Sequence, residues 1–274
     1  MPIIAITREM GSLGKDVAQG VSEALGIPLV YHEIIDHLAD RMRLRKSHVM
    51  RLLDGSAGIL ERMTADKASL SIFAAEEIVN LARQGSGAVI RGWGATQLLR
   101  ELPQAVCVRV CAPFEVRLQR MLARVGMHDV DKVAEEIHNN DEAHAAIMRR
   151  HFSVDCNDPE QYDLVLNTER LSVSECVEQV LRLVRSPEFK ETGAARDQLE
   201  DLALACQVRA ALRRSPRTRD MRVSVSVEHA CVTFHGAGYS KEERAALKEV
   251  GASVPGVRET DDTMRTLNLR PRFA

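Results

Sequence analysis

The segment ITREMGSLGKDVAQ, residues 6–19, decides the fold that we predict for this chain. A short apolar run rich in β-branched residues precedes it, which is typical of a buried parallel strand, and a helical spacing of apolar residues follows. A Walker A loop, G-x-x-x-x-G-K-[ST], lies between a strand and a helix in the same way. Gly14 and Lys15 match that motif, whereas Glu9 stands at its first glycine and Asp16 at its Ser/Thr.

The loop before the predicted helix contains Gly11, Ser12, Leu13 and Gly14. Glycines let successive backbone N–H groups turn toward one point and form a nest for anionic oxygens. The amino-terminal end of the helix and the charge of Lys15 add to this positive field. The position between a strand and a helix therefore predicts a phosphate site. The alternative is a simple glycine turn with a solvated lysine.

Asp16 replaces the hydroxyl group that usually holds the Mg²⁺ ion of the nucleotide. A carboxylate also binds Mg²⁺, but its charge repels phosphates when the metal is absent. The alternative is a structural acid in the first turn of a helix, where the helix dipole favours it. Both interpretations stay open at this point.

The composition of the 274 residues excludes several classes of protein. The formal net charge of -2 gives no bulk attraction to nucleic acid, and the few aromatic residues argue against stacking platforms for single strands. No apolar run approaches the roughly 18 to 20 residues that span a bilayer, and the chain begins with no signal-peptide pattern. We therefore expect a cytoplasmic protein with no nucleic-acid partner and no transmembrane segment.

Strand-like and helical segments alternate along the first two thirds of the chain. This order predicts an α/β fold with a doubly wound parallel sheet over residues 1–185. The expected strands are residues 2–7, 27–31, 87–92, 105–112 and 162–168. The expected helices are residues 15–26, 32–83 with a break at 54–58, 113–126, 129–152 and 172–184.

The pattern changes near residue 186. Residues 186–196 are polar and have no apolar period, which is typical of a linker or a frayed segment. Residues 197–274 are predicted to form a small α+β domain of a different kind.

The elements of this second domain follow from short local patterns. A helix is expected from about residue 197 to 214, and strict alternation over residues 222–236 predicts an antiparallel hairpin. Ser240 and Glu243 have the spacing of a capping box at the start of another helix. A last short strand is expected around residues 263–269.

Three arginines share one face of the helix predicted after the fourth strand. Arg117, Arg120 and Arg124 are spaced at i, i+3 and i+7, and Arg149 lies farther along the chain. Phosphoryl transfer needs cations around the moving group, and the planar donor fork of arginine suits this role. The alternative is a solvated basic face paired with nearby glutamates.

These residues together resemble the cytidylate kinase-like family, a branch of the P-loop nucleoside monophosphate kinases. The similarity extends from about Ile3 to Val184. Its matching segments are ITREMGSLGKDVAQ, LGIPLVYHEII, VIRGWGA, VCAPFEVRLQRML and NDPEQYDLVLNTERLSVSECVEQV. The family loop resembles REFGSGG followed by a basic and an acidic residue, so Glu9, Lys15 and Asp16 are typical of the family.

The resemblance implies a nucleotide-binding core with a helical acceptor-binding insertion and an arginine-bearing lid. It implies transfer of the γ-phosphate of ATP, with Mg²⁺, to a nucleoside monophosphate such as CMP or dCMP. The implied ATP contacts are Gly11, Ser12, Leu13, Gly14, Lys15 and Asp16, with Mg²⁺ on Asp16. The implied catalytic residues are Lys15, Arg117, Arg120, Arg124 and Arg149. The implied substrate contacts are Glu33, Arg91, Trp93 and Asp141.

Four positions depart from the family pattern. Leu13 replaces a glycine, Tyr31 an aspartate, Trp93 the arginine of a GRGA-like turn, and His144 an arginine of the lid region. Trp93 has two interpretations, stacking on a base or buried packing. These departures keep a second hypothesis open, a nucleotide-binding regulator without catalysis. A third hypothesis, a purely structural interaction protein, is at odds with the glycine loop.

Residues from about 197 to 269 resemble a BON domain. The similarity rests on VRAALRRSPRTRD, VSVSVEHACVTFHGAGYS and VPGVRE. BON domains are small α+β binding modules, so the resemblance implies a protein or phospholipid partner. In the second hypothesis, bound nucleotide controls which partner this domain binds. Whether the chain forms a homo-oligomer stays open.

Overall fold

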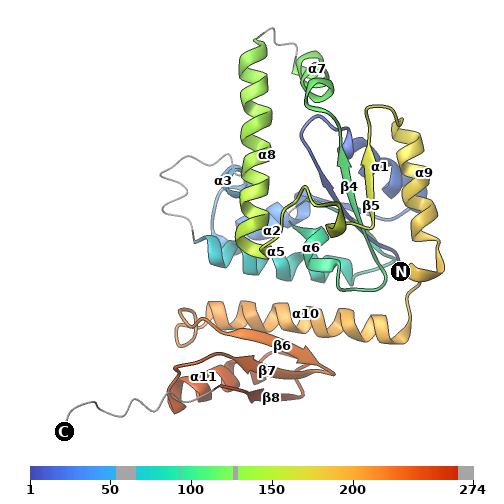
Figure 1. Cartoon of the computed structure of the whole chain (residues 1–274). Coiled ribbons are helices and arrows are strands. Elements are labelled where there is room, and N and C mark those ends of the chain that lie inside the picture. The colour runs from blue at the N-terminus through green and yellow to red at the C-terminus, as the bar shows by residue number, and fades with distance from the viewer. Residues whose placement is uncertain (54–65, 93, 126–128, 265–274) are drawn as a thin grey trace. The chain divides into compact units, whose positions relative to one another are not determined.

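The computed structural model describes residues 1–53, 66–92, 94–125 and 129–264 (Figure 1). The chain divides into two compact units, residues 1–195 and 196–274. Each unit has its own sheet and its own core.

The first unit is built on a parallel sheet, as the alternating pattern predicted. Its strand order is β2-β3-β1-β4-β5, and every described pair of neighbouring strands is parallel. After β1 the chain continues to β2 and β3, which lie on one side of β1 in the sheet. After β4 it continues to β5, which lies on the opposite side. The crevice between β1 and β4 is therefore the topological switch point, where ligands of such sheets bind. The strands are β1 (Ile3–Arg8), β2 (Leu29–Val30), β3 (Ala88–Arg91), β4 (Ala105–Cys111) and β5 (Leu164–Asn167).

Helices cover both faces of this sheet. On one face α1 (Gly14–Leu25) and α9 (Val173–Val184) pack together, and Ile4 and Ile6 of β1 share a core with their apolar residues. On the other face the Cys107 thiol of β4 reaches the Thr96 carbonyl oxygen of α6 (Ala95–Leu99). Strand residues alternate between two buried faces, which explains why they are apolar almost throughout.

Further helices complete the first unit. The pair α7 (Phe114–Val125) and α8 (Val130–Phe152) packs through Leu118, Met121 and Ile137, and lies toward the carboxyl ends of the strands (Figure 1). The other α-helices within the described residues of this unit are α2 (His32–Met42), α3 (Lys46–Leu53) and α5 (Lys67–Ala82). The break predicted at residues 54–58 lies outside the described residues.

The second unit contains an antiparallel hairpin and a capped helix, as predicted. Its sheet has the order β6-β7-β8, with β6 and β7 antiparallel and β7 and β8 parallel. The Ser240 hydroxyl and the Glu243 carboxylate form the expected capping box of α11. The elements are α10 (Gly193–Arg214), β6 (Ser224–Glu228), β7 (Cys231–His235), α11 (Lys241–Ala252) and β8 (Glu259–Asp262).

One boundary predicted from the sequence is wrong, and another is largely untested. The polar segment 186–196 contains a short 3-10 helix, Pro187–Phe189, and the first residues of α10. This helix begins early because the Thr192 hydroxyl accepts a hydrogen bond from the Ala195 N–H. The last described strand is the acidic Glu259–Asp262, and the strand expected around residues 263–269 lies, apart from residues 263 and 264, outside the described residues.

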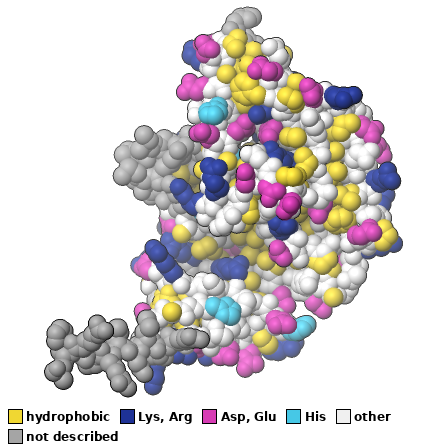
Figure 2. Space-filling model, in the orientation of Figure 1, with side chains coloured by type: hydrophobic (Ala, Val, Ile, Leu, Met, Phe, Trp, Pro, Cys, Tyr) yellow, Lys and Arg dark blue, Asp and Glu magenta, His cyan; other side chains and the backbone are white. Residues whose placement is uncertain are grey.

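Charged side chains of both signs are interspersed on the face shown in Figure 2. Among the helices that the structure describes, none is both long and apolar enough to cross a membrane.

Candidate active site

The predicted phosphate loop lies between the last residue of β1, Arg8, and the first residue of α1, Gly14. Two of its positions require glycine. A Cβ atom on Gly11, whose φ is 80°, would lie 2.9 Å from the Arg117 carbonyl oxygen. A Cβ atom on Gly14 would lie 2.6 Å from the Arg8 Cβ atom. Because Cβ atoms essentially never come this close to neighbours, the loop backbone packs directly against β1 and α7.

Leu13, at a position where the resemblance implies a glycine, adopts the left-handed backbone conformation. It is the residue before α1, with φ 60° and ψ 14°, and its carbonyl oxygen accepts from the N–H groups of Asp16 and Val17. A side chain in this region is strained by about 1–2 kcal/mol relative to right-handed backbone. The substitution at Leu13 therefore keeps the loop conformation rather than abolishing it.

Thr168 and Arg120 hold the loop from behind. The buried Thr168 hydroxyl donates to the Ser12 carbonyl oxygen at 2.8 Å, and Arg120 Nη1 reaches the Gly11 carbonyl oxygen at 3.5 Å. Arg120 also donates to the hydroxyl and carbonyl oxygens of Thr168 at 2.9 and 2.7 Å. Arg120 therefore braces the loop backbone in this structure.

The side chains of the loop divide into buried and exposed groups. Ser12 is buried, and its hydroxyl donates to the Glu9 carbonyl oxygen at 2.8 Å. Lys15 and Asp16 are exposed in the first turn of α1. A ligand above the helix end would meet the charged side chains, while Ser12 serves the conformation of the loop.

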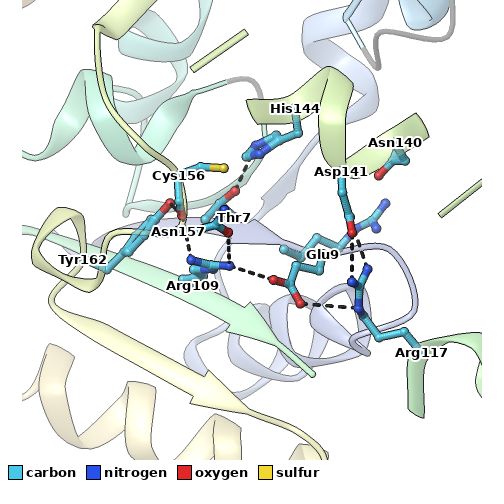
Figure 3. Close-up of a pocket in the computed structure, with 11 residues that line it drawn as sticks. Thr7, Glu9, Arg109, Arg117, Asn140, Asp141, His144, Cys156, Asn157 and Tyr162 are labelled. Carbon is cyan, nitrogen blue, oxygen red and sulfur yellow. Dashed lines mark hydrogen bonds and ion pairs between the residues drawn. The ribbon is translucent and has the colours of Figure 1, made fainter. Parts of the chain in front are cut away.

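A polar pocket of about 210 Å³ lies beside the loop, at the carboxyl ends of β1 and β4 (Figure 3). Thr7 and Arg109 are register partners on these strands, so their side chains share one face of the sheet. Asn140, Asp141 and His144 of α8 point toward this face. The lining residues are Thr7, Arg8, Glu9, Arg109, Arg117, Asn140, Asp141, His144, Cys156, Asn157 and Tyr162.

Glu9 is the central carboxylate of the pocket. One of its oxygens accepts from Arg109 Nη2 at 2.7 Å, and the other lies 3.5 Å from Arg117 Nε. The second oxygen also accepts from the Ala112 N–H at 3.2 Å. Glu9 thus joins the end of β1, the end of β4 and the first turns of α7. Charge-assisted bonds of this kind are stronger than neutral ones, and they fix the two guanidinium groups.

Arg117 is buried and forms a two-pronged ion pair with Asp141 of α8. Its Nη2 atom lies 2.8 Å from Asp141 Oδ2, and its Nη1 atom lies 3.2 Å from Oδ1. Burial raises the pKa of the Asp141 carboxyl, against the lowering effect of Arg117. Within the pocket, this ion pair links α7 to α8.

Arg109 connects the pocket to the segment after α8. It donates through Nη1 to the Cys156 carbonyl oxygen and through Nη2 to Asn157 Oδ1, both at 2.7 Å. The Tyr162 hydroxyl donates to the same Cys156 carbonyl oxygen at 2.9 Å, and burial raises the pKa of this phenol. The segment is therefore fixed against β4 by one arginine.

His144 is held neutral in the pocket. Its Nε2 atom shares a hydrogen bond of 3.2 Å with the Thr7 hydroxyl. Burial, and then the charges of Arg109 and Arg8, lower the pKa of His144 from 6.5 to about 4. The histidine therefore contributes no positive charge at neutral pH, at a position where the resemblance implies an arginine.

The structure brings some of the predicted site residues together and separates others. Arg117 and Asp141 meet in the pocket, whereas the exposed Arg124 and Arg149 do not line it. At the carboxyl end of β3, the Arg91 guanidinium lies 3.7 Å from the centre of the Tyr31 ring. The exposed Glu33 accepts from the Tyr31 N–H, and Trp93 lies outside the described residues.

Sequence reasoning missed Arg109, Asn157 and Tyr162 as pocket residues. Arg109 interrupts the apolar run AVCVRVCA, and a charged residue inside a buried strand pattern is a usable indication of a site at that point. Asn157 and Tyr162 lie in the segment NDPEQYDLVLNTERLSVSECVEQV, which resembles the family, but the sequence alone indicates no role for either residue in the site.

Comparison with known proteins identifies relatives of the first unit. Residues 3–170 match the sequence profile of the cytidylate kinase-like family. The chain is 29% identical over 170 residues to a cytidylate kinase from Methanothermobacter thermautotrophicus, which covers 61% of this chain and 96% of that protein. It is 26% identical over 178 residues to a cytidylate kinase from Pyrobaculum aerophilum, covering 65% and 89%.

A solved structure shares the fold of this unit. It is that of an uncharacterized protein from Eubacterium ventriosum, with a TM-score of 0.54 and 20% identity. The match covers 68% of this chain and 99% of that protein.

Proposed function

Because this chain belongs to the cytidylate kinase-like family, we propose that it transfers the γ-phosphate of ATP to a nucleoside monophosphate, with CMP or dCMP as the acceptor. The observation that carries this proposal is the glycine loop between β1 and α1, which lies at the same sheet edge as the arginine-lined pocket. Phosphoryl transfer depends on positioning and on electrostatic stabilisation of equatorial oxygens. Backbone N–H groups, a lysine and arginines supply both.

In this proposal the loop residues Gly11 to Gly14 hold the phosphates of ATP through their N–H groups. The bracing of the loop carbonyl oxygens by Thr168 and Arg120 supports it, because bonded carbonyl groups cannot turn toward the phosphates. Lys15 is exposed at the start of α1 and would add a charge at the β- and γ-phosphates.

Asp16 would be the protein's contact to Mg²⁺. Its carboxylate is exposed in the first turn of α1, beside the loop. Mg²⁺ in kinases keeps several waters and binds one or two carboxylates together with substrate phosphates, so a single exposed carboxylate suits it. When bound, the metal would neutralise charge on the transferred phosphate.

The acceptor would bind across the carboxyl ends of β1 and β3. The names of the two relatives, both cytidylate kinases, support a cytidine nucleotide as acceptor. Contacts to it by Glu33, Arg91 and Trp93 are part of the proposal, as are lid contacts by Arg124 and Arg149.

The acceptor is tested by initial rates of transfer from Mg-ATP to a panel of CMP, dCMP, UMP, AMP and GMP, with products separated by chromatography. The proposal expects CMP or dCMP to be phosphorylated faster than the purine nucleotides. Equal rates on all five acceptors, or faster transfer to AMP or GMP, would overturn the acceptor assignment.

A nucleotide-binding regulator without catalysis is the second candidate. The observation that favours it is the neutral His144, which adds no positive charge to the pocket at a position where the resemblance implies an arginine. Calorimetric titration with ATP, run beside the acceptor panel, separates the two candidates. A regulator binds ATP yet transfers phosphate to none of the five acceptors.

The second unit would serve as a binding module. Its described residues form a three-stranded mixed sheet and two helices, with a core that includes Phe234 and Leu247. We propose from its BON-like sequence that it binds a protein or a phospholipid surface. Flotation of the full chain with phosphatidylglycerol vesicles tests the lipid case, and recovery at the level seen with phosphatidylcholine vesicles would exclude it.

A further inference from the structure

The donor groups of Arg117 are divided between fixed and exchangeable partners. Its Nε atom donates to the Ala112 carbonyl oxygen at 3.0 Å, and Nη1 donates to the Met10 carbonyl oxygen at 3.3 Å. These partners are backbone groups that follow shortly after β1 and β4. The terminal edge formed by Nη1 and Nη2 faces the two oxygens of Asp141 (Figure 3). That edge is the one that arginine uses for carboxylates and phosphates alike.

We propose that the Asp141 carboxylate is an internal stand-in for an anion on Arg117, and that a phosphate group binds the pocket by replacing it. The identity of that phosphate as part of a nucleotide rests on the proposed function. The exchange itself rests only on the geometry of the pocket, so it is testable with simple phosphates.

Asp141 is the carboxylate that can leave. Its side chain is 33% exposed, against 22% for Glu9, and it lies on the surface of α8 facing the pocket. Arg117 is its hydrogen-bond partner among the described residues, whereas Glu9 also bonds Arg109 and the Ala112 N–H. A change of side-chain rotamer would release Asp141 to water, while Glu9 would keep both guanidinium groups in place.

The exchange does not require α8 to detach. One turn before Asp141, Ile137 is fully buried in the core shared by α7 and α8, and Val133 is nearly so. One turn after it, His144 bonds the Thr7 hydroxyl. The helix is thus anchored on both sides of the residue that moves.

The charges of the pocket suit the exchange. Three arginines, Arg8, Arg109 and Arg117, line it together with the carboxylates Glu9 and Asp141. An incoming phosphate that displaces Asp141 into solvent would supply at least the negative charge that leaves, with its oxygens on the Arg117 fork. The pocket is therefore closed to anions by its own aspartate at rest and becomes an anion site when that aspartate turns away.

This assignment predicts the opposite sign from a direct substrate contact. If Asp141 bonds the base or sugar of the acceptor, its removal weakens the binding of CMP and leaves inorganic phosphate unaffected. If Asp141 competes with phosphate for Arg117, its removal strengthens the binding of every phosphate compound, because the competent state is no longer a minor one.

The test is calorimetric titration of the full chain with inorganic phosphate, pyrophosphate and CMP. We expect Asp141→Asn to bind pyrophosphate and CMP about tenfold more tightly than the parent. Glu136→Gln is the matched control, since it removes one exposed carboxylate from the same helix, and we expect less than a twofold change. Free phosphate and CMP as separate titrants distinguish a simple anion site from one that requires the nucleoside.

A double substitution separates competition from a general gain in positive charge. Lysine at position 117 keeps the charge but lacks the two-pronged fork. The gain from Asp141→Asn should therefore fall below twofold in an Arg117→Lys background if it acts through the fork. A gain of equal size in both backgrounds would overturn the proposal. Thermal melts show that each of the compared chains is folded. Asp141→Ser serves as a second replacement that also removes the carboxylate.

Three results would overturn the proposal: weaker binding of CMP by Asp141→Asn, unchanged binding of all three titrants, or no binding by any variant. A chain that gains affinity in Asp141→Asn yet transfers no phosphate would leave the proposal standing while the proposed kinase activity fails.

Discussion

The neutral state of His144 makes the stability of the first unit depend on pH in a defined direction. Its folded-state pKa of about 4 lies below the value of 6.5 for a solvated histidine. Protons therefore bind the unfolded chain more readily, so the stabilising contribution is present above about pH 6.5 and is lost as the pH falls toward 4. Integrating the linkage relation from pH 7 to pH 4.5 gives a loss of about 2 kcal/mol of unfolding free energy through this one residue.

The assay compares urea denaturation of the parent with that of His144→Gln over this pH range. Fluorescence of Trp93, the only tryptophan of the chain, follows the first unit. The parent should lose about 2 kcal/mol more than His144→Gln between pH 7 and pH 4.5. His138→Gln is the matched control, because His138 lies on the same helix with a side chain that is 70% exposed, and its curve should follow the parent.

Parallel curves for the parent and His144→Gln would refute the reasoning. They would mean that the imidazole takes up a proton in the folded state as easily as in water. A curve for His138→Gln that departs from the parent by the same amount would refute it too, since the effect would not be specific to the buried position.

Two further predictions concern the phosphate loop. In urea denaturation, Leu13→Gly should leave the unfolding free energy unchanged or raise it by up to about 1 kcal/mol. The reason is that relief of left-handed strain offsets the greater conformational freedom of glycine in the unfolded chain. A loss above about 1 kcal/mol would show that the Leu13 side chain packs against the loop. Thr168→Val keeps the shape but removes the hydroxyl that bonds the Ser12 carbonyl oxygen and Arg120, so we expect a loss of about 1–3 kcal/mol. No loss in that denaturation experiment would show that the brace is unimportant.

Local patterns predicted those features that depend on neighbours in the sequence. The strand–loop–helix order around Gly14, the antiparallel hairpin and the capping box at Ser240 all arise from contacts within a few residues. The parallel sheet followed from buried strands alternating with helices, because such strands are apolar on both faces.

The partners within the pocket could not be predicted in the same way. Helical spacing placed Arg117 and Arg120 on one face, yet they serve different partners, the pocket carboxylates and the loop carbonyl oxygens. Glu9 and Arg109 form an ion pair although 100 residues separate them in the sequence. Such pairs depend on strand register and on helix packing, which a single sequence does not show.

The early start of α10 and the strand β8 escaped prediction for a related reason. A single side-chain cap at Thr192 starts α10 within a polar segment, and periodicity carries no information about it. The strand β8 is acidic, and ion pairs from Arg244 and Lys248 to Asp262 stabilise it in place of apolar alternation.

The central claim is that the loop between β1 and α1 supports phosphoryl transfer. The most direct measurement is the rate of γ-phosphate transfer from Mg-ATP to CMP by the parent, by Lys15→Ala and by Lys190→Ala. Lys190 is an exposed lysine outside the loop and serves as the control. The account predicts transfer by the parent and by Lys190→Ala, with a loss of about 100-fold or more in Lys15→Ala. Equal rates in the parent and Lys15→Ala would contradict it.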